Sequence, residues 1–185
     1  MDADELFEKA QRYFLKGKYK ESVRVFSEVV EAGYEPAITF MSRGVSYLRM
    51  NEREMAIQDF DRAIGIDDRD AAAYYFRGSA HMLGGDYTRA LSDFNRAIER
   101  NPEHRAALLA RGVSYVSLGR NAEGARDISK AMRYAEAAIQ GFSDMTGWRG
   151  QLEKVLAAME GEKKRETEQL TEEDIKALKY WLKAA

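Results

Sequence analysis

Several residue types that build catalytic and metal sites are missing or rare in this sequence. The 185 residues include no cysteine, which excludes a disulfide framework, a thiolate zinc site and a cysteine nucleophile. Only two histidines occur, His81 and His104, and their spacing matches no metal motif. The sequence also lacks G-x-S-x-G, a phosphate-binding glycine-rich loop and H-E-x-x-H. We therefore expect no enzyme activity, no cofactor and no bound metal.

An excess of charge of one sign is also lacking. The chain has 29 basic and 31 acidic residues, a formal net charge of −2. Without a basic excess it has little attraction for nucleic acid or for an anionic membrane surface. No apolar run approaches the ~18 residues that a membrane span requires. The charged, amphipathic stretch 1–14 has no apolar core of a leader peptide, so we expect a cytoplasmic protein.

Proline is scarce, since only Pro36 and Pro102 occur, and long helices are unobstructed. What the sequence does contain is a repeat with a period of 34 residues, in four windows that abut: 3–36, 37–70, 71–104 and 105–138. A small residue recurs at one position: Ala10, Gly44, Gly78 and Gly112. A second small residue recurs at Ser22, Ala56, Ala90 and Gly124, followed by a large apolar one at Phe26, Phe60, Phe94 and Ile128. Such a fixed period is typical of repeat architectures.

The spacing inside each window predicts two amphipathic helices. In the third window Tyr74, Gly78 and His81 share the face of a first helix, and Ala90, Phe94 and Ala97 share that of a second. His81 replaces a packing tyrosine, so we expect it at the helix interface, while His104 lies in the turn between windows. Between the two helices Gly84-Gly85-Asp86 indicates a turn, and Gly17, Asn51 and Gly119 stand at the same place in the other windows.

This pattern resembles the tetratricopeptide repeat family. The third window carries the family's signature almost completely: Tyr74, Gly78, Gly85, Tyr87, Ala90, Phe94, Ala97 and Pro102. The second and fourth windows keep most of it, and the first is the weakest, with Ala10, Ser22 and Val29 at signature positions. The resemblance implies an all-α fold, a right-handed α-solenoid of helix hairpins with a concave groove.

A pair of opposite charges also follows the repeat. The arginines Arg43, Arg77 and Arg111 precede the glycines, and the aspartates Asp59, Asp93 and Asp127 precede the large apolar residues. Two interpretations stay open at this point: an Arg–Asp pair that braces the two helices of each repeat, or an arginine ladder that binds an anionic ligand. Because each arginine has a matching aspartate in its own window, the sequence favours the brace.

The resemblance also implies a binding surface, because the first helix of each pair lines the concave groove in this family. The candidate partner-binding residues are Phe7, Gln11, Met41, Val45, Leu48, Tyr75, Phe76, Ser79, Met82, Leu109, Val113 and Val116. They are mostly apolar, which suits an amphipathic helix or an extended apolar peptide. Some family members clamp the C-terminal carboxylate of a chaperone with Lys, Asn and Arg. Here the matching positions carry Phe7, Gln11, Ser42, Ala72 and Phe76, so a chaperone-tail adaptor is disfavoured.

The sequence after the repeats predicts additional helices. We expect residues 139–161 to hold an extension and a capping helix, and 162–185 a charged linker followed by an amphipathic helix. The last helix opens at Thr171, and its apolar stripe is Ile175, Leu178, Trp181 and Leu182. Two hypotheses stay open: this helix caps the body of the protein, or it inserts into the groove of its own or a neighbouring chain.

The functional prediction is a non-enzymatic adaptor or scaffold that binds a protein or peptide partner in its groove. The alternative is a structural unit that assembles with itself, with its C-terminal helix packed in its own or a neighbour's groove. A third possibility is an accessory subunit of an enzyme, inactive alone. No nucleic-acid or membrane partner is expected, and the sequence leaves the oligomeric state open.

Overall fold

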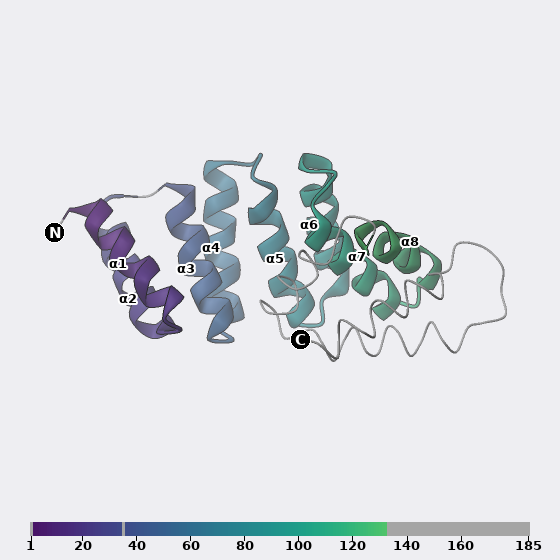
Figure 1. Cartoon of the computed structure of the whole chain (residues 1–185), viewed down its shortest axis with the longest axis horizontal. Helices are drawn as coiled ribbons and strands as arrows, with labels where there is room; N and C mark the ends of the chain where they lie inside the picture. The colour runs from purple at the N-terminus through teal and green to yellow at the C-terminus, as the bar shows by residue number, and fades with distance from the viewer. Residues whose placement is uncertain (1, 35, 133–185) are drawn as a thin grey trace. The chain divides into compact units, whose positions relative to one another are not determined.

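The computed structural model describes residues 2–34 and 36–132, and every regular element within them is an α-helix (Figure 1). The first helices of the four repeats are α1 (Ala3–Leu15), α3 (Ala37–Arg49), α5 (Ala71–Leu83) and α7 (Arg105–Ser117). The second helices are α2 (Tyr19–Glu31), α4 (Arg53–Ile66), α6 (Tyr87–Arg100) and α8 (Asn121–Met132). The paired helices that the sequence period predicts are therefore present in all four windows.

The chain divides into two compact units, which are described separately. The N-terminal unit is Met1–Gly85 and contains α1 to α5, and the C-terminal unit is Asp86–Ala185, in which α6 to α8 are described. Within the N-terminal unit each helix packs against the next, and α1, α3 and α5 also contact one another in sequence order. Within the C-terminal unit α7 packs against both α6 and α8.

The turns within the repeats share one backbone conformation, because the second residue after the first helix is left-handed each time. Its φ is 69° at Gly17, 61° at Asn51, 81° at Gly85 and 75° at Gly119. After three of these turns a backbone amide donates to a carbonyl five residues earlier, as Lys18 N does to Tyr13 O at 2.9 Å. This is the Schellman arrangement, and it satisfies carbonyls that the helix end leaves free. The prediction of a left-handed turn at Asn51 and the glycines is confirmed.

Side chains cap several helix starts, including one that sequence reasoning missed. The carboxylates of Asp70 and Asp86 accept hydrogen bonds from the amides of Ala72 and Arg89, at 2.8 and 3.0 Å. His104, interpreted from the sequence as a residue of the turn, is the N-cap of α7, where its Nδ1 accepts from the amide of Ala107 at 3.2 Å. Each cap satisfies an amide that has no partner inside its helix.

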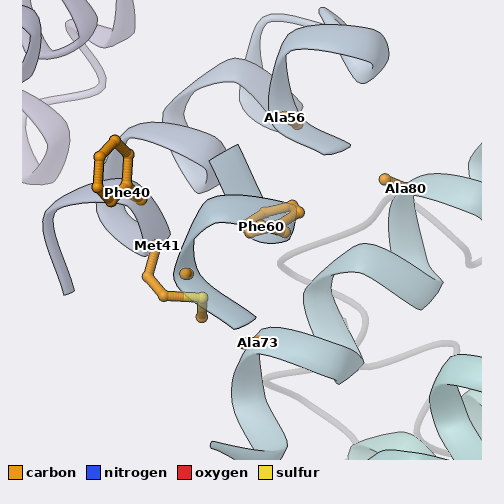
Figure 2. Packing of buried hydrophobic residues seen from close by; sticks show 7 residues of the cluster. Phe40, Met41, Ala56, Phe60, Ala73 and Ala80 are labelled. Atoms are coloured by element: carbon orange, nitrogen blue, oxygen red, sulfur yellow. The ribbon is translucent and has the colours of Figure 1, made fainter. Parts of the chain in front are cut away.

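Small residues allow the two helices of a repeat to approach closely. A Cβ placed on Gly44 would lie 2.6 Å from Cε1 of Phe60, and one on Gly112 would lie 2.7 Å from Cγ1 of Ile128. Phe60 belongs to a buried cluster from α3, α4 and α5 that also contains Phe40, Met41, Ala56, Ala63, Ala73 and Ala80 (Figure 2). The glycine positions of the repeat are therefore packing positions.

The first repeat keeps this plan with different residues. Ala10 and Phe26 are fully buried, and the hydroxyl of Ser22 donates to the carbonyl of Ala10 at 3.0 Å. The Oγ atoms of Ser22 and Ser46 are also 3.2 Å apart, a buried hydrogen bond that links the first two repeats. A hydroxyl thus stands where later repeats place alanine or glycine.

The predicted segments after the repeats lie outside the described residues. This applies to the extension and capping helix at 139–161 and to the charged linker and amphipathic helix at 162–185. The described part of α8 ends at Met132.

Candidate protein-interaction face

Positions 34 residues apart form rows across the first helices of the N-terminal unit, since α1, α3 and α5 lie next to one another. The first row is Phe7, Met41 and Tyr75. The second row is Gln11, Val45 and Ser79, and the third is Phe14, Leu48 and Met82. We refer to these nine residues as the first-helix face. Most of the residues that the sequence nominates for binding in this unit belong to it.

In each row the residue on α5 is more deeply buried than the residue on α1. In the second row Gln11 is exposed, Val45 is half-buried and Ser79 is fully buried. In the first row Phe7 is half-buried, and the exposure falls to 6% at Met41 and 2% at Tyr75. In the third row Phe14 and Leu48 are half-buried and Met82 is fully buried. The accessible part of the face therefore lies on α1 and α3.

The accessible part is apolar and partly aromatic. The Phe7 ring makes edge contacts with Phe26 and Tyr34, with centroid distances of 5.5 and 6.5 Å. These two contacts fix the orientation of the ring. Phe14 meets Tyr19 at 5.5 Å in the same way. Val45 and Leu48 pack with one side against the buried cluster of α3 to α5 and keep the other side partly open. Rings and branched side chains held in this way form a preorganised apolar surface.

Two large apolar side chains extend this surface at its ends. Leu15, the last residue of α1, is 82% exposed, and Ile38, in the first turn of α3, is 54% exposed. Single exposed apolar residues are ordinary on a protein surface, but these two lie on the same two helices as the half-buried residues above. Together they lengthen the apolar surface along both α1 and α3.

The remaining nominated residues take part in packing. The Phe76 ring stacks on Phe60 of α4 at 5.8 Å with an interplanar angle of 19°, and so lies against the core. Tyr75 is buried beside Phe76, and this burial raises the pKa of its hydroxyl. Ser79 donates to the carbonyl of Tyr75 at 2.8 Å. These contacts bury Tyr75, whereas Phe76 stays half-buried, as Phe7, Val45 and Leu48 do.

The last three nominated residues lie on α7 in the C-terminal unit. Leu109 and Val113 are buried, with 1% and 0% exposure, and Val116 is half-buried. A Cβ placed on Gly124 of α8 would lie 2.5 Å from Cγ2 of Val116, so Val116 packs directly on that glycine. The assignment of all twelve residues to partner binding stays a prediction.

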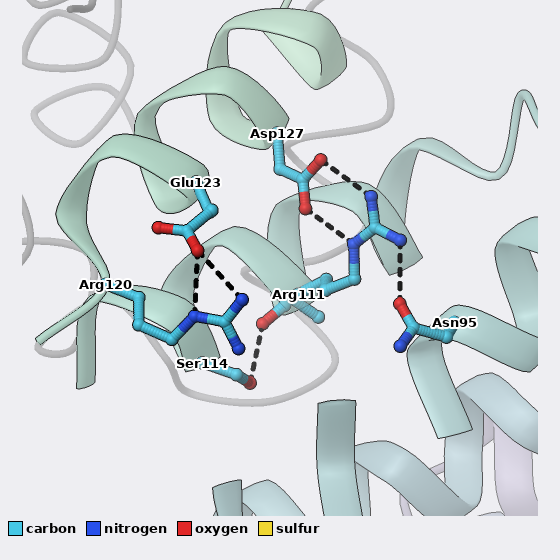
Figure 3. A network of polar contacts seen from close by, with 7 residues as sticks. Asn95, Arg111, Ser114, Arg120, Glu123 and Asp127 are labelled. Atoms are coloured by element: carbon cyan, nitrogen blue, oxygen red, sulfur yellow. Dashed lines mark hydrogen bonds and ion pairs between the residues drawn. The ribbon is translucent and has the colours of Figure 1, made fainter. Parts of the chain in front are cut away.

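Arg–Asp pairs brace the second and fourth repeats. In the second repeat Arg43 donates to both carboxylate oxygens of Asp59, at 2.8 and 2.7 Å, with Arg43 9% and Asp59 3% exposed. In the fourth repeat Arg111 holds Asp127 at 2.6 and 2.8 Å (Figure 3). These hydrogen bonds raise the pKa of both arginines, although burial opposes the effect. For these two repeats the predicted brace is confirmed, because the carboxylate occupies the guanidinium fork.

Sequence reasoning missed a second partner of each arginine, in the preceding repeat. Arg43 Nη1 donates to Ser27 Oγ at 3.1 Å. In the same way Arg77 Nη1 donates to Asp61 Oδ1 at 2.7 Å, and Arg111 Nη1 donates to Asn95 Oδ1 at 2.8 Å. Ser27, Asp61 and Asn95 are themselves 34 residues apart, a polar position that follows the large apolar one. The arginines therefore link consecutive repeats: α2 to α3, α4 to α5 and α6 to α7.

Among the described residues no group of three or more His, Cys, Asp or Glu side chains is arranged to hold a metal ion. In the same part of the chain, no helix has both the length and the apolar character needed to cross a membrane.

Comparison with known protein families identifies the 34-residue repeat. The tetratricopeptide repeat family matches residues 37–70 and again residues 71–104. The chain is a tetratricopeptide repeat (TPR) protein. The family prediction is confirmed, and a comparison with curated proteins found no match.

Solved structures of TPR proteins share the fold. MamA superposes with a TM-score of 0.69 at 19% identity, over 95% of this chain and 92% of MamA. YrrB, described as a TPR protein with an unusual peptide-binding site, superposes with a TM-score of 0.65 at 24% identity, over 71% of this chain and 68% of YrrB. The first TPR domain of Spaghetti (RPAP3), bound to the HSP90 peptide SRMEEVD, superposes with a TM-score of 0.61 at 25% identity, over 63% of this chain and 93% of that domain. The predicted fold class, an all-α TPR solenoid, is confirmed.

Proposed function

We propose that this TPR protein is a non-enzymatic interaction module that binds an apolar peptide segment, helical or extended, on the first-helix face of its N-terminal unit. The observation that carries the proposal is the accessible part of that face. Half-buried Phe7, Val45 and Leu48 are fixed by core contacts beneath them, while their open sides point away from the core clusters. Fixed apolar side chains bind with little loss of conformational entropy.

The charged residues of the repeats support the same proposal. The Arg43 and Arg111 guanidinium groups, which would otherwise suit an anionic ligand, are already held by Asp59 and Asp127. The face itself offers an exposed amide at Gln11 and apolar side chains around it. A partner is therefore recognised by apolar contacts, with hydrogen bonding to its backbone or polar groups at Gln11.

Two similar structures make peptide binding a reasonable activity for this chain. YrrB is described as having a peptide-binding site, and the RPAP3 domain is bound to a peptide. The acidic SRMEEVD peptide of the latter differs from the apolar partner proposed here, because the positions of the matching clamp carry Phe7, Gln11 and Phe76. The adaptor role and the cytoplasmic location stay part of this proposal.

The test is a selection of binding peptides with a matched pair of variants. Random 12-residue peptides displayed on phage are selected on the full chain, and each selected peptide is then titrated by fluorescence anisotropy. Val45→Glu places a charge in the face, whereas Met55→Glu places one on α4, where the side chain is 42% exposed. We expect peptides rich in aliphatic and aromatic residues whose affinity falls about tenfold or more with Val45→Glu, since a carboxylate buried against apolar groups is costly.

The same titration has a clear negative result. Selected peptides that bind Val45→Glu and Met55→Glu equally well place the binding site elsewhere. Peptides that are polar and lose affinity in salt show that the surface recognises charge, and the proposal is then wrong in its chemistry.

A further inference from the structure

We propose that a second side of α1, formed by Leu6, Lys9 and Tyr13, docks an amphipathic helix of another protein that places an aspartate or glutamate against Lys9. We refer to these three residues as the outer side of α1. They share one side of the helix, because residues three and four apart lie above one another, and Phe7, Gln11 and Phe14 share a different side. The site is therefore separate from the first-helix face and goes beyond the proposed function.

The chain itself shows three times what packs on this side of a first helix. α2 packs against α3, α4 against α5, and α6 against α7. In each of these pairs an arginine of the first helix donates to a polar residue of the second helix before it. These arginines stand at the repeat position of Lys9: Arg43, Arg77 and Arg111. The outer side of α1 is therefore equivalent to a surface that joins consecutive repeats.

The three covering helices share one pattern of side chains. An apolar residue stands four positions before the hydrogen-bond acceptor and another stands three positions after it. The sets are Val23, Ser27 and Val30 in α2, Ile57, Asp61 and Ile64 in α4, and Leu91, Asn95 and Ile98 in α6. This spacing lies along one side of a helix. Val30 and Ile64 pack against the buried cluster of α3 to α5. A helix with this pattern is thus what covers the side of a first helix that Lys9 occupies on α1.

The outer side of α1 is more open than its equivalents in the other repeats. Leu6 is half-buried. At the same repeat position the exposure is 3% at Phe40, 8% at Tyr74 and 0% at Leu108. Leu6 and Tyr13 pack inward on the buried cluster of α1 and α2, and each keeps part of its surface open. Apolar side chains fixed in this way are preorganised to receive a helix.

Two of the repeats balance the charge of their arginine internally. Arg43 is held by Asp59 of its own repeat, and its acceptor on α2 is a neutral hydroxyl, that of Ser27. Arg111 is held in the same way within the fourth repeat, and its acceptor on α6 is a neutral amide. In these two repeats the covering helix therefore supplies a hydrogen bond and no charge.

The charge of Lys9 sets the chemistry of the partner helix. Its own repeat offers no matching carboxylate, because Val25 stands at that position. Among the residues that the structure describes, Lys9 makes no hydrogen bond or ion pair. An ammonium group that a docked helix covers requires an opposite charge on that helix. α4 shows the arrangement, since Asp61 accepts from Arg77 at 2.7 Å. The partner helix therefore carries Asp or Glu, with apolar residues four positions before it and three after it.

The sequence of α4 supplies a probe with this pattern. A synthetic peptide of residues 53–66 is held helical by a hydrocarbon link between positions 55 and 59, on the side of the helix away from Asp61. It is titrated by fluorescence anisotropy into the full chain, the Lys9→Glu chain and the Lys20→Glu chain. Lys20 is an exposed residue of α2, so its variant makes the same change in net charge. We expect the affinity to fall about tenfold with Lys9→Glu and to stay unchanged with Lys20→Glu.

A charge exchange separates an ion pair from a general loss of binding. The Asp61→Lys peptide should bind the original chain about tenfold more weakly than the original peptide does. It should also bind the Lys9→Glu chain more tightly than the original peptide does. Equal affinities for the Lys9→Glu and Lys20→Glu chains overturn the proposal, and so does a peptide that binds none of the chains.

Two further measurements decide the place and the occupant. Val45→Glu, in the first-helix face, should leave the affinity for the α4 peptide unchanged. If that variant abolishes binding, the peptide sits on the first-helix face and the proposal is overturned. Sedimentation velocity of the full chain without peptide should give the same result with and without Lys9→Glu. Self-association that Lys9→Glu abolishes would place a second copy on the outer side of α1, and it would overturn the choice of occupant.

Discussion

The first two helix hairpins, α1–α2 and α3–α4, follow one 34-residue plan but hold their helices together by different means. In α3–α4 a glycine lies against Phe60, and a buried Arg43–Asp59 pair joins the helices. In α1–α2 the equivalent positions carry Ala10, Lys9 and Val25, and a serine hydroxyl supplies the polar contact. The difference shows that the small and large apolar positions define the hairpin. The charged brace is an addition whose arginine also reaches the preceding repeat.

The same comparison bears on function. In the first hairpin the face residues Phe7 and Gln11 are more open than their equivalents in the second, Met41 and Val45. The second hairpin is tied to both neighbours, by Arg43 to Ser27 and by Arg77 to Asp61. An accessible hairpin beside a braced one gives a face that is both open and rigid.

The largest expected effect comes from breaking the brace of the second hairpin. Asp59→Ala leaves the guanidinium of Arg43 buried without its carboxylate, so the free energy of unfolding should fall by about 3–5 kcal/mol. Val25 stands at the same position of the first hairpin, where no buried charge depends on it. Val25→Ala should therefore lower the free energy of unfolding by less than Asp59→Ala does. Denaturant unfolding followed by circular dichroism measures both.

Two controls sharpen this prediction. Glu99→Ala removes the surface ion pairs of this exposed carboxylate with Arg96 and Arg100 and should change the free energy of unfolding by less than about 1 kcal/mol. The double variant Arg43→Met, Asp59→Leu should regain most of the loss, because apolar side chains of similar size replace buried ion pairs well. A loss from Asp59→Ala below about 1 kcal/mol would contradict a buried brace.

A smaller effect is expected where the helices of the second hairpin touch. Gly44→Ala forces the Phe60 ring to move within a packed cluster, at a cost of about 1–3 kcal/mol. Gly65→Ala is the matched control in α4, since no other residue lies within 4 Å of its added Cβ, and it should raise stability by about 0.5–1 kcal/mol. If both glycines respond alike to alanine in thermal unfolding, close approach is not what Gly44 provides.

The smallest effect concerns the hydroxyl that replaces the brace in the first hairpin. Ser22→Ala removes the hydrogen bonds to Ala10 O and Ser46 Oγ and should lower the free energy of unfolding by about 1 kcal/mol. In this variant the single proton of the Ser46 hydroxyl donates to the carbonyl of Ser42, so no buried hydroxyl is left unsatisfied. Chemical denaturation of Ser22→Ala and Ser46→Ala, alone and combined, gives the coupling between them. Additive losses would show that the two hydroxyls act separately.

Much of this structure was predictable because the repeat fixes local geometry. The position of Asn51 and the glycines predicted left-handed turns, and the Arg43–Asp59 pairing followed from matched charges in one window. The burial along the rows was not predictable, since equivalent residues such as Gln11 and Ser79 differ only in what surrounds them. The partners Ser27, Asp61 and Asn95 escaped notice because three residue types fill one position. The stacking of the Phe76 ring on Phe60 was not predictable either, because periodicity alone does not decide how a ring is turned.

The central claim is that, within one repeat, some residues hold the helices together and others bind the partner. Val45, a residue of the accessible face, tests this claim most directly. A peptide selected on the full chain is titrated into Val45→Glu, and the unfolding of the same variant is measured in parallel. Because Val45 is only half-buried, the free energy of unfolding should change by no more than about 1 kcal/mol, while peptide affinity falls about tenfold or more. Unchanged affinity in a fully folded Val45→Glu chain would contradict the account.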